Sequence, residues 1–202
     1  MSKINQGILG GFSGKTGKVV GAIYRGVATM RGLPAKTEWD TTPAQAVAKK
    51  KFSAINSILS PFNIAINKGF IAKGVLTEWN LAVKANYSKL VLNDDGSYSL
   101  PPEQLSLSNG KIAFSVNIVR NGDKLDVSWN TPDANSKLYG ADIYLVLHNP
   151  TNGNVIMQSF SSSASEATAS YASLEATDED KINAYAFAAT DSVSSKCTYS
   201  II

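Results

Sequence analysis

The sequence contains few of the residues on which most enzymes and metal sites depend. Among its 202 residues are one cysteine, Cys197, and one histidine, His148. One cysteine excludes a disulfide framework and any multi-cysteine metal site, and one histidine excludes multi-histidine metal sites. Histidine is also the commonest general acid or base in enzymes. We therefore predict a protein that is not an enzyme and that needs no cofactor or metal.

Charged residues and long apolar runs are scarce as well. Asp, Glu, Lys and Arg make up 17% of the chain, against about 25% in an average protein. Apolar residues make up 44%, which is enough for a core and excludes wholesale disorder. No run of about 18 apolar residues is present, so no membrane span is expected. The N-terminus lacks the apolar segment of a secretory signal, so we expect synthesis in the cytoplasm.

The two halves of the chain have opposite net charges. Residues 1–92 contain 13 Lys and Arg against 3 Asp and Glu, a net charge of +10. Residues 93–202 contain 6 Lys and Arg against 13 Asp and Glu, a net charge of −7. Opposite charges steer subunits together head to tail, and a basic end also attracts phosphates. The plainer alternative is that both halves are simply solvated.

Glycine is concentrated near the N-terminus. Residues 1–34 contain 8 of the 15 glycines, 5 Lys or Arg and no acidic residue. The β-branched and aromatic residues between these glycines predict two strands, 19–24 and 27–31, joined by a turn at Arg25-Gly26. Glycines weaken a strand and allow another backbone to approach closely. We therefore predict that residues 1–40 form a basic β arm that becomes ordered against a partner.

Residues 41–92 have the periodicity of helices. Thr42-Pro43-Ala44-Gln45 combines an N-cap, a proline at the first helical position and a glutamine three residues after the cap, and it predicts a helix over 43–59. Two further helices are predicted to begin at Ser60-Pro61 and at Thr77. The first helix has an apolar stripe made of Ala48, Phe52, Ile55 and Leu59. Its basic surface is made of Lys49, Lys50 and Lys51, which are predicted to face mostly water.

From about residue 88 the hydrophobic period falls to two. A hairpin is predicted over 88–100, and at least seven short alternating strands follow it. Regular short strands of this kind predict a β-sandwich over 93–202. The predicted core of that sandwich includes Phe114, Val127, Trp129, Leu145 and Tyr185. The fold class is therefore α+β: a glycine-rich arm, a short helical segment and an all-β sandwich.

The C-terminal part resembles a fibronectin type III or immunoglobulin-like domain. The run Leu125-Asp126-Val127-Ser128-Trp129, followed by Thr131-Pro132, resembles the tryptophan-bearing second strand of such domains. Leu174, followed by Lys181-Ile182-Asn183-Ala184-Tyr185, resembles the turn into their tyrosine-bearing strand. The resemblance implies a module for binding or spacing, because such sandwiches rarely carry catalysis.

The N-terminal half is similar to a large uncharacterised family of Bacteroidota proteins. The residues that carry the similarity are INQGILGGFSGKTGKVVGAIYRGVATMRGLP and the following helix, from Thr-Pro-Ala-Gln through Lys49-Lys50-Lys51-Phe52. That family joins such an N-terminus to a C-terminal β-sandwich and implies no activity. A looser resemblance, through Arg-x-x-Pro and Thr-Pro-Ala-Gln, is to short proteins of phage and prophage neighbourhoods. Glu38-Trp39-Asp40 departs from the basic, proline-rich linker usual there.

Three motifs come close to known sites without matching them. Gly10–Thr16 resembles a phosphate-binding loop, but the required first glycine is replaced by Leu9, so a flexible turn is predicted. His148 is predicted to face outward on its strand, and we expect no Ser–His–Asp site there. The acidic residues of 175–180 lack the spacing of a calcium loop and are predicted to form a solvated turn.

The functional hypothesis is a non-enzymatic structural protein that assembles into a multisubunit particle. A phage virion component or a filament-forming subunit fits best, with other copies of the chain or other particle proteins as partners. The arm would add a strand to a neighbour's sheet, which leads to rings or filaments if the contact is head to tail. Its contact residues would be Val20, Ala22 and Tyr24 as buried alternates and Arg25 and Arg31 as partners of acidic groups.

Two alternatives use the same features differently. The basic half, with Phe12, Tyr24 and Trp39, could bind nucleic acid through phosphate contacts and base stacking, although it contains no known reader motif. A cell-surface adhesion module would fit the sandwich but would need a signal sequence.

Overall fold

A computed structural model describes residues 2–3, 12–35, 40–72, 74–122, 124–133, 135–175 and 181–202. The chain divides into two compact units, Met1–Thr42 and Pro43–Ile202. The helices of residues 43–92 therefore lie in the same unit as the strands that follow them.

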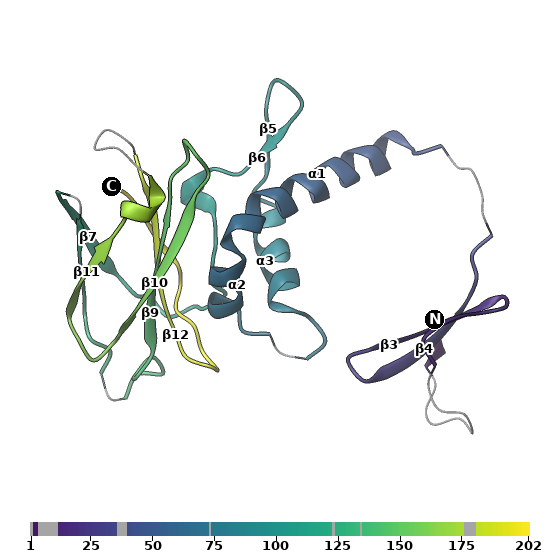
Figure 1. Ribbon diagram of the computed structural model, residues 1–202, viewed down its shortest axis with the longest axis horizontal. Coiled ribbons are helices and arrows are strands. Elements are labelled where there is room, and N and C mark those ends of the chain that lie inside the picture. The colour runs from purple at the N-terminus through teal and green to yellow at the C-terminus, as the bar shows by residue number, and fades with distance from the viewer. Residues whose placement is uncertain are drawn as a thin grey trace. The chain divides into compact units, whose positions relative to one another are not determined.

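The first unit is an antiparallel sheet with the strand order β1-β4-β3-β2, of which β3 and β4 are labelled in Figure 1. Its strands are β1 Ser2–Lys3, β2 Gly14–Thr16, β3 Val19–Tyr24 and β4 Val27–Gly32. Arg25 and Gly26 have φ angles of 50° and 77°, the left-handed pair of a two-residue type I′ turn. The predicted hairpin is thus confirmed at its turn, where Tyr24 pairs with Val27.

The second unit begins with the helices. They are α1 Pro43–Leu59, the 3₁₀ turn η1 Ser60–Phe62, α2 Asn63–Gly69 and α3 Glu78–Tyr87. The hydroxyl of Thr77 accepts a hydrogen bond from the backbone N–H of Asn80 at 3.2 Å, which makes it the N-cap of α3. The predicted starts at Pro43 and Thr77 are therefore confirmed, whereas the segment at Ser60 begins with the 3₁₀ turn and its α-helix begins at Asn63.

The strands of the second unit are all antiparallel. A small hairpin comes first, and two sheets follow it, with the orders β11-β8-β7 and β10-β9-β12-β13. The hairpin is β5 Val91–Leu92 and β6 Tyr98–Ser99, followed by the 3₁₀ turn η2 Pro102–Gln104. The sheet strands are β7 Val116–Asn121, β8 Lys124–Trp129, β9 Asp142–His148, β10 Val155–Ser161, β11 Glu166–Ser170, β12 Asn183–Ala189 and β13 Thr198–Ile201, with the 3₁₀ turn η3 Ala172–Leu174 after β11. The α+β class is confirmed.

Alternate residues of the two sheets form one core between them. The buried side chains of β8 and β9 that meet there are Leu125, Val127, Trp129, Ile143, Leu145 and Leu147. Small residues of β12, Ala184, Ala186 and Ala188, complete that core. Period-two alternation accounts for this arrangement, because it places these residues on one face of each strand.

A second core lies on the other face of the β10-β9-β12-β13 sheet, beneath the helices (Figure 1). Its sheet residues are Tyr144, Val146, Tyr185 and Phe187, and its helical residues include Ile55, Leu59, Phe62 and Ile66. The prediction that Tyr185 belongs to the core between the sheets was wrong. Tyr185 faces the helices, and its ring centroid lies 5.9 Å from that of Phe62. Strands β9 and β12 are consequently buried on both faces.

The apolar stripe predicted for α1 is buried over only half of the helix. Ile55 and Leu59 are fully buried, whereas Ala48 is exposed and Phe52 is 57% exposed. The other helices are short, and the first turns of α1 extend beyond them (Figure 1). The prediction of one continuous buried stripe was therefore wrong for its N-terminal half.

The fully buried Asn86 joins α3 to the segment that leads into the sheets. Its amide donates to the carbonyl oxygens of Ala82 and Ser106, each at 2.9 Å, and its Oδ1 accepts from the N–H of Ser106 at 2.8 Å. We expect Asn86→Ala to lower the free energy of unfolding by about 2–3 kcal/mol, because it leaves the partly buried N–H and carbonyl groups of Ser106 without their partner. Asn80→Ala, at an exposed position of the same helix, should change it by less than about 0.5 kcal/mol. Urea denaturation compares the two, and equal losses would contradict the role given to Asn86.

Candidate functional site

The N-terminal sheet has almost no core of its own. Among residues 12–35 and 40–42, which the structure describes, Gly21 is the one buried residue. The ring of Phe12 occupies the space that a side chain at Gly21 would need. Glycine at this position thus allows Phe12 to lie directly on the sheet, as the close-approach role of strand glycines predicts.

Large apolar side chains are exposed on both faces of this sheet. Ile23, 53% exposed, lies with Met30 on one face, and Tyr24, 54% exposed, lies with Val27 on the other. Monomeric proteins rarely expose apolar groups in this concentration unless another molecule covers them.

The residues predicted to make intersubunit contacts share one face of the sheet. Val20, Ala22 and Tyr24 alternate along β3; Val20 is half-buried and the other two are exposed. Arg31 is the cross-strand partner of Val20 and so projects from the same face. Arg25 lies in the turn, where its guanidinium carbon is 5.9 Å from the centroid of the Tyr24 ring. The sheet therefore brings the five predicted residues together, and their burial by a partner stays a prediction.

One edge of β3 has a free stretch among the described strands. β2 pairs only with Val19–Gly21, so no described strand pairs with Ala22–Tyr24 on that side. Unpaired backbone groups at a sheet edge are a template for a strand of another chain.

The three lysines of α1 do not form one uniform basic surface. Lys49 and Lys50 are exposed, as predicted, but Lys51 is half-buried. The ammonium group of Lys51 lies 5.3 Å from the centroid of the Tyr98 ring in β6. A cation over an aromatic face is attracted by the ring, so Lys51 joins α1 to the β5–β6 hairpin.

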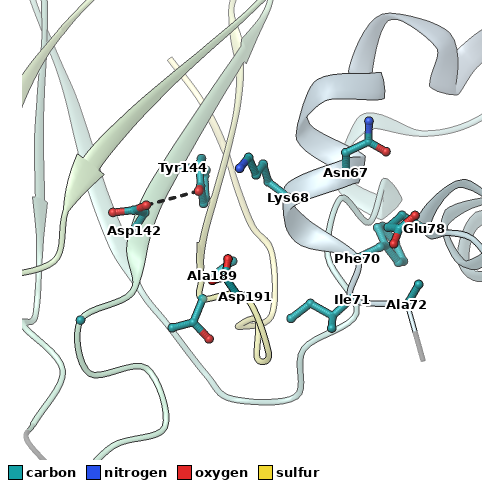
Figure 2. Close-up of a pocket in the computed structure, with 12 residues that line it drawn as sticks. Asn67, Lys68, Phe70, Ile71, Ala72, Glu78, Asp142, Tyr144, Ala189 and Asp191 are labelled. Atoms are coloured by element: carbon teal, nitrogen blue, oxygen red, sulfur yellow. Dashed lines mark hydrogen bonds between the residues drawn. The ribbon is translucent and has the colours of Figure 1, made fainter. Parts of the chain in front are cut away.

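A polar cleft of about 400 Å³ lies between α2, the N-terminal end of α3 and one end of the four-stranded sheet (Figure 2). Its charged lining residues are Lys68, Glu78, Asp142 and Asp191. The hydroxyl of Tyr144 donates to Asp142 at 3.5 Å, and burial raises the pKa of Tyr144, which keeps the phenol protonated. Sequence reasoning missed this cleft, because its residues come from four separate segments. The carboxylates can accept cationic groups, but among the described residues no set of three or more potential metal ligands is grouped together.

The structure also describes part of the near-match to a phosphate-binding loop and the single cysteine. Residues Gly14–Thr16 form strand β2, paired with β3, rather than a loop that opens a helix. Burial raises the pKa of Cys197 to about 11, so its thiol stays protonated at neutral pH. Several residues discussed in the sequence analysis lie outside the described residues, namely Gly10, Gly11, Glu38, Trp39 and Asp178–Asp180.

His148 does not face outward as predicted. It is half-buried, with its ring centroid 5.3 Å from that of Phe62 in an edge-to-face contact. The helices cover the face of β9 that the sequence pattern suggested was open, which is why that prediction was wrong. Burial lowers the pKa of His148, so the folded protein favours the neutral ring.

This burial predicts a pH dependence of stability. The unfolded chain, with a histidine pKa of about 6.5, binds a proton more readily than the folded chain. The free energy of unfolding should therefore fall as the pH drops from 7 to 5, with a slope below the single-proton limit of about 1.4 kcal/mol per pH unit. Because the chain has one histidine, His148→Gln should remove this slope. Thermal or urea unfolding at several pH values measures it, and an unchanged slope in the variant would assign it to other groups.

Comparisons with known proteins identify a family and little else. No helix of the described part of the chain combines the length and apolar character that a bilayer crossing needs. No curated protein matches the chain. A solved structure with some similarity is the Clostridium perfringens spore cortex lytic enzyme SleM, at 16% identity and a TM-score of 0.34, over 46% of this chain and 28% of that one. The model of a family of unknown function, DUF6266, matches residues 11–200. The chain therefore belongs to the DUF6266 family.

Proposed function

We propose that the protein is a non-enzymatic assembly subunit whose N-terminal sheet docks on a neighbouring subunit. The observation that carries this proposal is a sheet that exposes apolar side chains on both faces and buries almost nothing itself. Ordering a backbone costs about 1–2 kcal/mol per residue, which a sheet with so small a core cannot offset alone. A partner that covers Tyr24 and Val27 would supply the missing burial.

Charge supports a partner of the same kind. Residues 1–42 contain 6 Lys or Arg and 2 Asp or Glu, a net charge of +4, whereas residues 93–202 carry −7. The sheet of one copy is therefore attracted to the acidic strands of another. Such a contact is head to tail, so it builds rings or filaments. On the side of β3 where no described strand pairs with Ala22–Tyr24, the backbone provides groups for strand addition.

We infer that the particle is a phage virion or a filament, on the resemblance of the N-terminal half to phage-associated proteins. We also infer that the two packed sheets are an immunoglobulin or fibronectin type III-like sandwich that serves as a spacer. The chain alternates between the sheets in the manner of such folds: β7, β8 and β11 belong to one sheet and β9, β10, β12 and β13 to the other. The buried Trp129 on β8, the second strand of the two packed sheets, supports the same interpretation.

A second candidate function is nucleic-acid binding by the same sheet. The observation that favours it is that four cationic residues of the sheet and one aromatic ring are exposed: Lys15, Lys18, Arg25, Arg31 and Tyr24. The ring of Phe12, in contrast, packs at Gly21 and is less available for base stacking. This function predicts a steep loss of binding with salt, caused by counterion release.

The test replaces the exposed apolar residues in the full chain. Tyr24→Asp with Val27→Asp should reduce the mass of the assembly in light scattering, because a buried charge without a partner opposes docking. Ile64→Asp with Val75→Asp makes the same change at exposed apolar positions of the second unit and should leave the mass unchanged. An unchanged mass in the first variant would rule out the sheet as the docking surface.

A further inference from the structure

Strand β10 is an open edge of the β10-β9-β12-β13 sheet and lacks the features that usually protect such an edge. It pairs with β9 on one side, and no described strand pairs with it on the other. Its seven residues include no charged residue, proline or glycine, and residues 149–165 around it contain no Asp, Glu, Lys or Arg. Natural proteins protect sheet edges with charges, prolines or very short strands, because an open edge pairs with strands of other chains. An edge of this length and neutrality is therefore suited to pairing.

Hydrogen bonds just beyond the two ends of β10 show which of its backbone groups face outward. The N–H of Asn149 donates to the carbonyl of Asn154 at 2.9 Å. The N–H of Ser162 donates to the carbonyl of Ala141 at 3.2 Å, and both pairs continue the register of β9 and β10. Hydrogen-bonded residues alternate along an antiparallel pair, so the even-numbered residues of β10 face β9. The residues whose N–H and C=O groups point away from β9 are therefore Val155, Met157 and Ser159. No described residue makes a hydrogen bond to these backbone groups.

Both cores of the second unit are incompletely covered at β10. Ile156 and Phe160 are partly buried against the core between the sheets. Val155 and Met157 are partly buried against the core beneath the helices. A strand added at the open edge would cover apolar groups on both faces of the sheet and would also pair the outward backbone groups. The edge therefore fits an extended, uncharged strand that has apolar residues on both of its faces.

Among the described strands with an open side, β10 of a second copy matches these requirements best. Strand β7 contains Arg120 and β11 contains Glu166, so each would place a charge beside the neutral edge. The other open strands are shorter: β13 has four residues, β2 has three, and β1, β5 and β6 have two each. The open stretch of β3 is limited to Ala22–Tyr24. Strand β10 offers seven uncharged residues and its own open edge.

We propose that β10 pairs with β10 of a second copy, antiparallel about a two-fold axis, and joins the two β10-β9-β12-β13 sheets into one continuous sheet. The three residues with outward backbone groups pair only with one another when the axis passes at Met157. Val155 of each copy then lies opposite Ser159 of the other. A two-fold contact requires a self-complementary surface, and a strand without charges meets its own copy without repulsion.

This inference does not depend on the proposed function, because β10 lies outside the N-terminal sheet. A filament of head-to-tail contacts and a two-fold contact can coexist in one particle. Failure of the N-terminal docking experiment would leave the β10 interface standing, and the reverse also holds.

The first test places a proline in the open edge. The parent is the full chain with Tyr24→Asp and Val27→Asp, so that N-terminal contacts do not contribute. Ser159→Pro removes an N–H that makes no bond within the chain, at an exposed position where an edge strand tolerates proline. It should raise the dimer dissociation constant at least about tenfold, because each copy loses a donor and the ring blocks the approaching strand. Sedimentation equilibrium measures the constant.

Two control variants accompany this change. Ser159→Ala keeps the N–H and should leave the dissociation constant unchanged. Ile201→Pro makes the same change at the opposite edge of the sheet: Ile202 exchanges both backbone hydrogen bonds with Ile182, so the N–H of Ile201 faces outward. This variant should also dimerise as the parent does. Circular dichroism checks that all three variants are folded.

Hydrogen exchange of the parent tests the interface without any change in β10. The amide protons of the odd-numbered residues 155, 157 and 159 should exchange at least about tenfold more slowly in the dimer than in dilute monomer, because only the partner strand protects them. The amide protons of residues 156, 158 and 160 are bonded to β9 and should be protected at both concentrations. A parent that stays monomeric at millimolar concentration would overturn the proposal. So would a dimer in which the odd-numbered amide protons exchange as fast as in the monomer, since another surface would then hold the copies together.

Discussion

A fragment of residues 93–202, which carries both sheets without the helices, is expected to lose cooperative folding. It would expose four side chains on the helix-facing side of β9 and β12, namely Tyr144, Val146, Tyr185 and Phe187, each at most 7% exposed in the whole protein. Burying one such side chain stabilises a protein by about 1.5–3 kcal/mol, so the loss is on the order of 6–12 kcal/mol. That is comparable with the whole stability of an ordinary domain, about 5–15 kcal/mol.

The matched control is a fragment of residues 43–202, which retains both cores. It should unfold in one cooperative transition, whereas the shorter fragment should aggregate or bind a hydrophobic dye strongly. Differential scanning calorimetry and dye fluorescence make the comparison. A shorter fragment that is monomeric and unfolds at the same temperature would show that the helices are dispensable for the sheets.

The second large effect is expected at Gly110. The segment around it packs against residues 194–196: the Ser108 hydroxyl donates to the carbonyl of Ser195 at 2.6 Å, and the N–H of Lys196 donates to the carbonyl of Ile112 at 2.8 Å. A Cβ atom at Gly110 would overlap the carbonyl oxygen of Ser194. Because backbone on both sides holds the two segments together, neither can move away cheaply.

We expect Gly110→Ala to lower the free energy of unfolding by about 3 kcal/mol or more, since overpacking against backbone has no flexible side chain to absorb it. Gly69→Ala should act similarly, because its Cβ would overlap the carbonyl oxygen of Leu107. Gly32→Ala is the control: no atom lies within 4 Å of its added Cβ, so it should cost less than about 1 kcal/mol. Chemical denaturation gives the three values, and a near-neutral Gly110→Ala would mean that the junction is looser than the structure shows.

Local chemistry made much of the fold predictable. The start of α1 at Pro43, the cap of α3 at Thr77 and the turn at Arg25-Gly26 depend on neighbouring residues, and each lies where the sequence places it. The shared face of Val20, Ala22 and Tyr24 follows from period-two alternation alone. These features need no knowledge of what packs on them.

Long-range burial was not predictable in the same way. The alternation of alanine with Tyr185 and Phe187 shows that the two faces of β12 differ, but not that helices cover the larger residues. Because the sequence does not show which surfaces the helices cover, His148 was predicted to face outward. For the same reason the stripe through Phe52 was predicted to be buried along its whole length. The polar cleft joins Lys68, Glu78, Asp142 and Asp191 only once the helices have packed on the sheet.

The mass of the full chain in solution tests the central claim most directly. Light scattering on nuclease-treated protein, over a wide range of concentration, should show a mass above that of a dimer that grows with concentration. Residues 43–202 alone should form nothing larger than a dimer. Salt near 1 M, where the screening length is about 3 Å, should weaken the assembly without dissolving it, because strand hydrogen bonds and apolar burial persist. A full chain that keeps the mass of one chain at every concentration, and changes only when DNA or RNA is added, would contradict the account.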